Sequence, residues 1–259
     1  MSPDELKEFL WEKAAQYEVP DFVPRDPLSI PHRYTDLRDV EVAGLFAATL
    51  AWGNRRTIVA NLESLMARMD DAPSEFVRNH SAKDLEVFEG FVHRTFQAAD
   101  AKGFVRALRA LYTRHDSLED VFLAHWKGNP DRENLKHALA GFHHDFANCD
   151  GVEARTRKHV ANPLRGSAAK RLNMYLRWMV RSSARGVDLG RWTRIPTSVL
   201  SIPLDVHTSN VGRSLGLLTR TANDWRAVEE LTAALRALDP VDPVRFDFAL
   251  FGLGAMEGF

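Results

Sequence analysis

Cysteine is almost absent from the chain: Cys149 is the single one among 259 residues. One thiol cannot form a disulfide within the chain, and it cannot supply the several thiolates of an iron–sulfur cluster or a cysteine-built zinc site. We therefore expect a protein of the reducing cytoplasm, with no cofactor and no metal in its site.

Long apolar runs are also missing. No stretch of about 18 consecutive apolar residues occurs, so the sequence holds no candidate for a membrane span and we expect no membrane partner. Residues 1–7 are acidic and amphipathic, unlike the basic and apolar leader of a secreted protein. Both observations favour a cytoplasmic location.

Strand signals are scarce as well. The sequence has no Val/Ile/Thr alternation of convincing length, no internal repeat and no low-complexity segment. Apolar residues instead recur at helical spacing, as at Val42, Leu45 and Phe46. Hydrophobic residues make up 45% of the chain, which is enough for a packed interior. The predicted fold class is all-α, with about ten to twelve helices.

The helices are expected at residues up to about 17, then at 40–52, 55–69, 73–79, 81–88, 98–115, 117–127, 131–147, 170–181, 205–217, 224–238 and 243–253. The proline-dense segment 19–35 is expected to be irregular, and residues 91–96 to form a loop. We expect one domain, 1–259, with two lobes. Residues 36–150 would make up most of one lobe, 151–220 a hairpin and catalytic segment, and 221–259 the C-terminal helices.

Charge is unevenly distributed along the chain. The formal net charge is only −1. Residues 153–194 nevertheless carry eleven Lys or Arg against two acids, a local net charge of +9. A basic segment on an acidic body is typical of a groove that faces a polyanion, although a solvated basic face would have the same composition.

The segment 165–217 carries the candidate chemistry. The small residues Gly166, Ser167 and Ala168 predict a tight hairpin whose amides, at a helix N-terminus, would favour a phosphate. Lys170 would lie just inside the following helix, beside Arg171. Positive neighbours and the helix dipole disfavour the charged form of a lysine, and this makes its amine nucleophilic.

Asp205 follows Pro203 and precedes the next helical segment. A partly buried carboxylate at that position could stabilise an oxocarbenium ion or assist deprotonation of a nucleophile. Taken singly, however, an Asp before a helix is usually an N-cap, and a Lys at a helix start is usually a surface charge. The pair in its context favours the functional interpretation.

These residues resemble the helix-hairpin-helix DNA glycosylase superfamily. That family has a hairpin L-P-G-x-G-x-K-T-A, in which Gly166 and Lys170 match the first Gly and the nucleophilic Lys. Its catalytic V-D-T-H-x-x-R-V-x-x-R-L-G-L is similar to the segment from Leu204 to Leu217, with Asp205 and His207 in register. Asn210 and Ser214 stand where the family has Arg, and Ala168 where it has the second Gly.

The 35 residues from Lys170 to Asp205 exceed the spacing of the iron–sulfur members and look more like that of the cluster-free archaeal 8-oxoguanine glycosylases. The segment from Leu45 to Asn54 is similar to the family's L-L-S-A-Q helix, whose polar end reaches into the DNA. The chain as a whole is similar to an uncharacterised bacterial protein family that shares S-A-x-K-R-L-N-M and I-P-L-D-x-H-T.

The resemblance implies a two-lobed helical protein, acting as a monomer on double-stranded DNA in the nucleoid, that removes a damaged base such as an oxidised purine. Lys170 would form a Schiff base at C1′, which couples base excision to AP lyase cleavage, and Asp205 would stabilise the sugar cation. Trp52 would line the base pocket, with Trp178 and Trp192 as alternatives for stacking or as core residues. The DNA-binding residues implied are Gly166, Ser167, Ala168, Arg171, His207 and Asn54.

Three other functions stay open at this point. The first is a DNA-structure-binding protein that kept the fold and lost the chemistry. The second is a metal-dependent phosphohydrolase, suggested by His143, His144 and Asp145, for which other helices would have to supply further ligands. The candidates for these ligands are His80, His93, His115 and His125. The third is a scaffold or a subunit of a repair complex.

Overall fold

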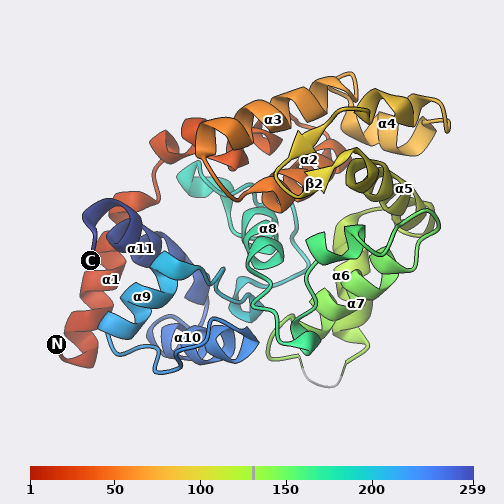
Figure 1. Ribbon diagram of the computed structural model, residues 1–259. Coiled ribbons are helices and arrows are strands. Elements are labelled where there is room, and N and C mark those ends of the chain that lie inside the picture. The colour runs from red at the N-terminus through yellow and green to blue at the C-terminus, as the bar shows by residue number, and fades with distance from the viewer. Residues whose placement is uncertain (130–131) are drawn as a thin grey trace. The chain divides into compact units, whose positions relative to one another are not determined.

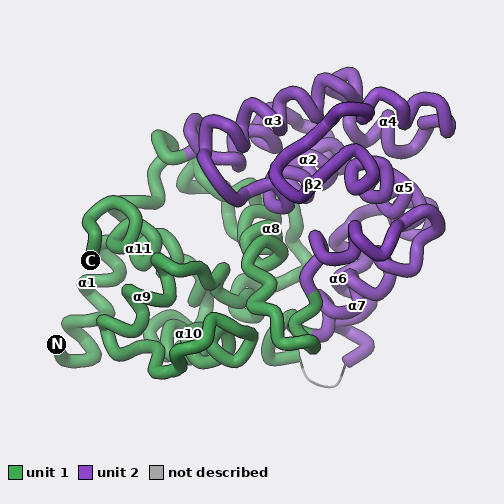
Figure 2. Tube along the Cα trace, in the orientation of Figure 1, with its two compact units in different colours: residues 1–22, 131–136, 162–259 green, residues 23–130, 137–161 purple. Residues whose placement is uncertain are grey.

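The protein is described by a computed structural model that covers residues 1–129 and 132–259 (Figure 1). These residues are predominantly helical, and their only sheet has two short strands. The all-α prediction is therefore confirmed. None of the described helices is both long and apolar enough to span a membrane. The chain divides into two compact units, each assembled from separated stretches of sequence (Figure 2).

Unit 1 consists of residues 1–22, 132–136 and 162–259 of the described chain. Its α-helices are α1 (Pro3–Tyr17), α8 (Lys170–Val180), α9 (Val206–Ser214), α10 (Trp225–Leu238) and α11 (Phe246–Gly252). Ser2 starts α1 with a capping box in which its hydroxyl and the Glu5 carboxylate each accept a backbone amide. α1 packs along α11, and α11 also packs against α9. Helices near the two ends of the chain, α1 and α11, are therefore in contact.

Unit 2 consists of residues 23–129 and 137–161 of the described chain. Its α-helices are α2 (Leu37–Leu50), α3 (Arg55–Ala67), α4 (Pro73–Asn79), α5 (Ala98–Arg114), α6 (Leu118–Lys127) and most of α7 (Lys136–Ala147). α2 is buried at every position from Val40 to Leu50. A cluster of aromatic rings, with Phe104 in contact with Phe46, Phe96 and Phe146, fills the core of this unit.

The prediction of a loop at residues 91–96 is wrong. Strands β1 (Val92–His93) and β2 (Phe96–Gln97) pair as an antiparallel hairpin in which His93 lies opposite Phe96. Arg94 takes a left-handed conformation with φ of 54°, which closes the turn. His93 and Phe96 are buried while Val92 is exposed. Strands of two residues are too short for their alternation to be visible in the sequence.

Several helix boundaries also differ from the predictions. Residues 81–88 contain a 3-10 helix, Asp84–Phe88, rather than an α-helix. The helix predicted at 131–147 begins at a position outside the described residues, and α7 itself begins at Lys136. The proline-dense segment forms three 3-10 helices, Pro20–Arg25, Pro27–Ser29 and Pro31–Arg33. Each starts with a proline, because proline fits the first position of a helical turn.

A buried ion-pair network crosses unit 1. Arg181, 4% exposed, follows α8 directly. Its guanidinium donates to Glu18 at the end of α1 over 2.7 Å, and to Asp242, just before α11, over 2.9 to 3.1 Å. It also donates to the buried Asp188. Burial alone would lower the pKa of Arg181, but these three carboxylates raise it above its ordinary value. Arg181 is therefore permanently charged and fixes α8 relative to both ends of unit 1.

Replacing Arg181 with methionine should destabilise the protein by about 3–5 kcal/mol, because three carboxylates would then lie in a buried region without their shared cation. Urea denaturation measures this loss. Arg185→Met is the matched control: Arg185 is exposed and its Nε lies 3.9 Å from Glu18. We expect the control to change stability by no more than about 0.5 kcal/mol. Equal losses for the two variants would contradict the structural role of Arg181.

Candidate functional site

Lys170 and Asp205 meet in unit 1. The Nζ atom of Lys170 donates to Oδ2 of Asp205 over 2.9 Å, although 35 residues separate them in sequence. Lys170 is the first residue of α8, and Asp205 is the N-cap of α9. The two side chains are 36% and 14% exposed. The pair is therefore a half-buried ion pair between two helix N-termini, one that solvent and a ligand could reach.

The backbone before α8 explains where Lys170 lies. Gly166, with φ of 89°, closes a 3-10 turn, Pro163–Arg165, and its carbonyl accepts the amide of Trp225. Ser167 then forms an isolated antiparallel bridge with Asp224. Ala169 takes a left-handed conformation with φ of 48° and starts α8 without a side-chain cap. The predicted hairpin is thus a tight turn, and a single 3-10 turn precedes it.

The other residues of unit 1 that were predicted to bind DNA differ in their contacts and in their exposure to solvent. The carbonyl of Ala168 accepts a hydrogen bond from Nδ2 of Asn173 over 3.1 Å. Arg171 is largely buried, and this burial lowers its pKa. His207 is exposed on α9, with its ring edge against Phe251. Of these three residues, only His207 presents its side chain mainly to solvent.

Asp205 has a dual structural role. Its Oδ1 atom accepts the amide of Thr208 over 2.9 Å and so caps α9, while Oδ2 faces Lys170. Burial alone would raise the pKa of Asp205, but Lys170 and the Thr208 amide outweigh it, so the pKa lies below the ordinary value of 3.8. Asp205 is consequently a carboxylate at neutral pH, as stabilisation of a cation requires.

The sequence reasoning missed two residues beside this pair, Arg177 and Asp247. Arg177 lies two turns after Lys170 on α8 and makes buried ion pairs with Asp247 on α11 and with Asp188. Burial raises the pKa of Asp247 to about 6, an effect to which the charge of Asp205 adds and which Arg177 and Lys170 oppose. An acid between two phenylalanines, Phe246 and Phe248, was the signal in the sequence for a buried carboxyl group.

The basic segment is divided between the two units. Residues 153–161 belong to unit 2 and residues 162–194 to unit 1. Arg177 and Arg181 are buried in ion pairs, and Arg155 pairs with the buried Asp100 over 3.0 Å. Three of the eleven cations of this segment therefore neutralise buried acids, while six others are exposed, namely Arg157, Lys158, Arg165, Arg185, Arg191 and Arg194.

Trp52 and Asn54 lie in unit 2, between α2 and α3. Asn54 caps α3, since its Oδ1 accepts the amides of Arg56 and Thr57 over 3.0 and 3.3 Å. The guanidinium of Arg94 lies 4.5 Å from the centre of a Trp52 ring. The cation–π contact already engages this indole, which was predicted to line a base pocket.

Trp178 and Trp192 are each 1% exposed and belong to the core of unit 1. Their burial excludes them as surface stacking platforms in this conformation. The histidines that suggested a metal site have separate partners. His143 bonds to the carbonyl of Val160 over 2.6 Å, and Asp145 bonds to His125 over 2.8 Å. Across residues 1–129 and 132–259, no group of three His, Cys, Asp or Glu could hold a metal ion.

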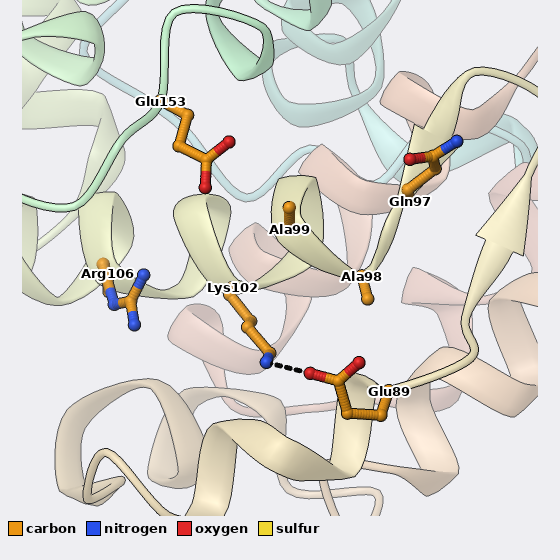
Figure 3. Close-up of a pocket in the computed structure, with 7 residues that line it drawn as sticks. All are labelled: Glu89, Gln97, Ala98, Ala99, Lys102, Arg106 and Glu153. Atoms are coloured by element: carbon orange, nitrogen blue, oxygen red, sulfur yellow. Dashed lines mark hydrogen bonds and ion pairs between the residues drawn. The ribbon is translucent and has the colours of Figure 1, made fainter.

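A pocket of about 450 Å³ lies on unit 2 (Figure 3). Its lining consists of Glu89, Gln97, Ala98, Ala99, Lys102, Arg106 and Glu153. Lys102 points toward Glu89 and pairs with it (Figure 3), and Arg106 donates to the carbonyl of Gly151 over 3.4 Å. None of the residues predicted for catalysis lines this pocket, and Glu89, Lys102 and Arg106 have partners within the protein.

Residues 26–256 match a family described as a protein of unknown function, DUF2400. The chain belongs to the DUF2400 family. This match includes both Lys170 and Asp205 and nearly all of unit 2, and it leaves out residues 1–22 of unit 1, which contain α1. No curated protein and no solved structure matches the DUF2400 protein described here. The geometry of the site therefore carries the functional argument.

In this DUF2400 protein, Asp205→Asn should keep the cap of α9 but lose the ion pair with Lys170, at a cost of about 0.5–1 kcal/mol at pH 7. A carboxyl group with a lowered pKa stabilises the fold above its ordinary pKa of 3.8, and this contribution is lost as the pH falls through the lower folded value. The free energy of unfolding of the wild-type protein and of Asp205→Asn should be measured by urea denaturation at pH 7, 5 and 3. The difference between the two proteins should be smallest at pH 3. A difference that does not change with pH would contradict the ion pair.

Proposed function

We propose that this protein is a base-excision DNA glycosylase with AP lyase activity, in which Lys170 is the nucleophile and Asp205 stabilises the sugar cation. The observation that carries the proposal is the 2.9 Å contact between Lys170 and Asp205 at the starts of α8 and α9. An amine and a carboxylate at one partly exposed position are the two groups that such a reaction requires.

The chemistry follows from the two groups. As the bond between C1′ and the damaged base breaks, the base leaves with the electron pair, and the carboxylate of Asp205 stabilises the positive charge on the sugar. The neutral amine of Lys170 adds to C1′. The ring oxygen then takes a proton from the nitrogen as the C1′–O bond breaks, which leaves a Schiff base between Lys170 and the opened sugar.

The turn before α8 offers a place for the DNA backbone. Gly166 and Ser167 are exposed, and α8 has no side-chain cap at Ala169. Amides at the start of a helix favour an anion, and small residues let a phosphodiester approach closely. Arg165, exposed beside this turn, adds positive charge. We therefore assign this turn to a phosphate next to the damaged nucleotide. An oxidised purine is among the candidate lesions.

A non-catalytic DNA-structure-binding protein is the second candidate. It is favoured by the fact that Asp205 already has a structural role as the cap of α9 and that Lys170 is paired with it in the resting structure. Such an ion pair would fix α8 to α9 whether or not chemistry takes place. The two candidates differ in one respect only, namely whether the amine of Lys170 attacks DNA.

Borohydride trapping on duplex DNA with an abasic site tests the proposal. The wild-type protein should form a covalent adduct, Lys170→Ala should abolish it, and mass spectrometry should locate the adduct on the peptide with Lys170. Lys158→Ala, an exposed lysine of the same basic segment, is the matched control and should trap normally. On duplexes with single oxidised bases, Asp205→Asn should slow excision roughly 10²–10⁴-fold.

Binding measured in the same samples separates the candidates. Binding of abasic DNA without an adduct would leave the DNA-structure-binding protein. The absence of both binding and adduct would contradict any nucleic-acid function for this site. An adduct that persists in Lys170→Ala would contradict the assignment of the nucleophile.

A further inference from the structure

The C-terminal segment of unit 1 lies against the start of α9. α11 continues directly into a π-helix, Leu253–Glu257, and this π-helix packs against α9. The backbone of Gly254 meets the side of α9 on which His207 and Val211 lie. π-helical turns are rare and are often found at functional sites. The C-terminal segment therefore contacts the helix that Asp205 caps, within a few residues of that cap.

Gly254 is required at this contact for space rather than for its backbone conformation. A methyl group added at Gly254 would lie 2.9 Å from Cβ and 3.2 Å from Cα of His207, and 3.1 Å from Cγ2 of Val211. The optimal separation of two non-bonded carbon atoms is about 3.5–4.0 Å. The φ angle of Gly254 is not in the left-handed region, so alanine could adopt the same backbone. Any side chain at this position would therefore push against the first turns of α9.

The first turn of α9 holds the carboxylate of Asp205. Oδ1 of Asp205 accepts the amide of Thr208 over 2.9 Å, and Oδ2 faces Lys170, also over 2.9 Å. The carbonyl of Asp205 accepts the amide of Ser209 over 2.9 Å as well. His207 belongs to the same turn, so a shift of its backbone moves the amides that bind Asp205. The position of the carboxylate relative to Lys170 thus depends on what contacts His207.

The C-terminal segment is itself held in place at both ends. Leu253, its first residue, is 1% exposed and so belongs to the core of unit 1. Glu257, its last residue, accepts the Nζ atom of Lys13 over 2.7 Å and also the hydroxyl group of Tyr17. Both partners belong to α1. Crowding at Gly254 would therefore act on α9, because the segment is anchored on either side of this residue.

We propose that Gly254 is a positioning residue for Asp205. Because Gly254 has no side chain, the C-terminal segment supports the first turn of α9 directly and sets the place of the Asp205 carboxylate opposite Lys170. The consequence for catalysis rests on the proposed function, in which a carboxylate must lie close to the developing sugar cation. The support of the first turn of α9 does not depend on that function.

Amide hydrogen exchange, followed by NMR without DNA, tests the support of Asp205. The reporter is the amide of Thr208, which Asp205 binds. In Gly254→Ala this amide should exchange roughly 5- to 50-fold faster than in wild type, because the added methyl group displaces the turn. Gly103→Ala is the matched control. It adds the same methyl group to α5 in unit 2, 3.1 Å from Cγ2 of Thr156, and should leave the exchange of Thr208 within about twofold of wild type.

Single-turnover excision tests the consequence for catalysis, on duplexes that each carry one oxidised purine. Gly254→Ala should excise the base roughly 10- to 100-fold more slowly than wild type, because a displaced carboxylate stabilises the sugar cation less well. Its Kd for duplex DNA with an abasic site should stay within about threefold of wild type, because the turn before α8 is unchanged. Partial unfolding would instead weaken binding as well. An equal loss of rate and affinity would therefore overturn the positioning role.

A second variant covers the case in which Gly254→Ala does not fold. Glu257→Gln weakens the anchor on α1 without crowding the core, since Glu257 is exposed. It should speed the exchange of Thr208 roughly 2- to 5-fold. Glu12→Gln, at an exposed acid of α1, is its control and should leave that exchange unchanged. An unchanged exchange of Thr208 in Gly254→Ala, or in Glu257→Gln if the first variant does not fold, would overturn the inference. Equal acceleration in Gly103→Ala would overturn it too.

The role of Gly254 and the proposed function can fail separately. Faster exchange of Thr208 in Gly254→Ala, with no excision and no trapping by the wild-type protein, would overturn the glycosylase and lyase proposal and keep the support of Asp205. Excision by the wild-type protein with an unchanged exchange of Thr208 in Gly254→Ala would do the reverse.

Discussion

Unit 1 depends on the buried guanidinium of Arg181. This one side chain holds carboxylates from the end of α1, from the segment after α8 and from the segment before α11. Removing one of these ionic partners destabilises the fold, because the remaining charge is then uncompensated in a region of low dielectric constant. The requirement fixes α8 with respect to α1 and α11, and therefore fixes the starting point of α8, where Lys170 lies.

The same network explains why a basic segment need not be a basic surface. Along the sequence, residues 153–194 carry a large excess of positive charge. In the folded chain, Arg177 and Arg181 point inward to acids that come from distant segments. Part of the positive charge of this segment is therefore buried rather than exposed.

Much of the helical structure was predictable, because residues that are close together in the sequence decide where a helix starts. Ser2, Asp36, Asn54, Ser117 and Asp224 stand at helix starts and cap them, as short polar side chains do. The hairpin of β1 and β2 was not predictable, because each strand has only two residues and the pairing of His93 with Phe96 is a tertiary contact. The single 3-10 turn before Gly166 was not predicted, because three residues are too few for a helical period to be visible in the sequence. In this chain the left-handed Gly166 ends that turn.

The sequence by itself determined the helical class, many of the helix starts and the presence of Lys170 and Asp205 at two of those starts, since spacing and capping are properties of neighbouring residues. Only the tertiary structure decided that these two side chains form an ion pair across 35 residues. It also decided that Trp178 and Trp192 belong to the core and that the buried Asp247 pairs with Arg177. Burial and charge pairing join residues that are far apart in the chain, and a local pattern does not contain that information.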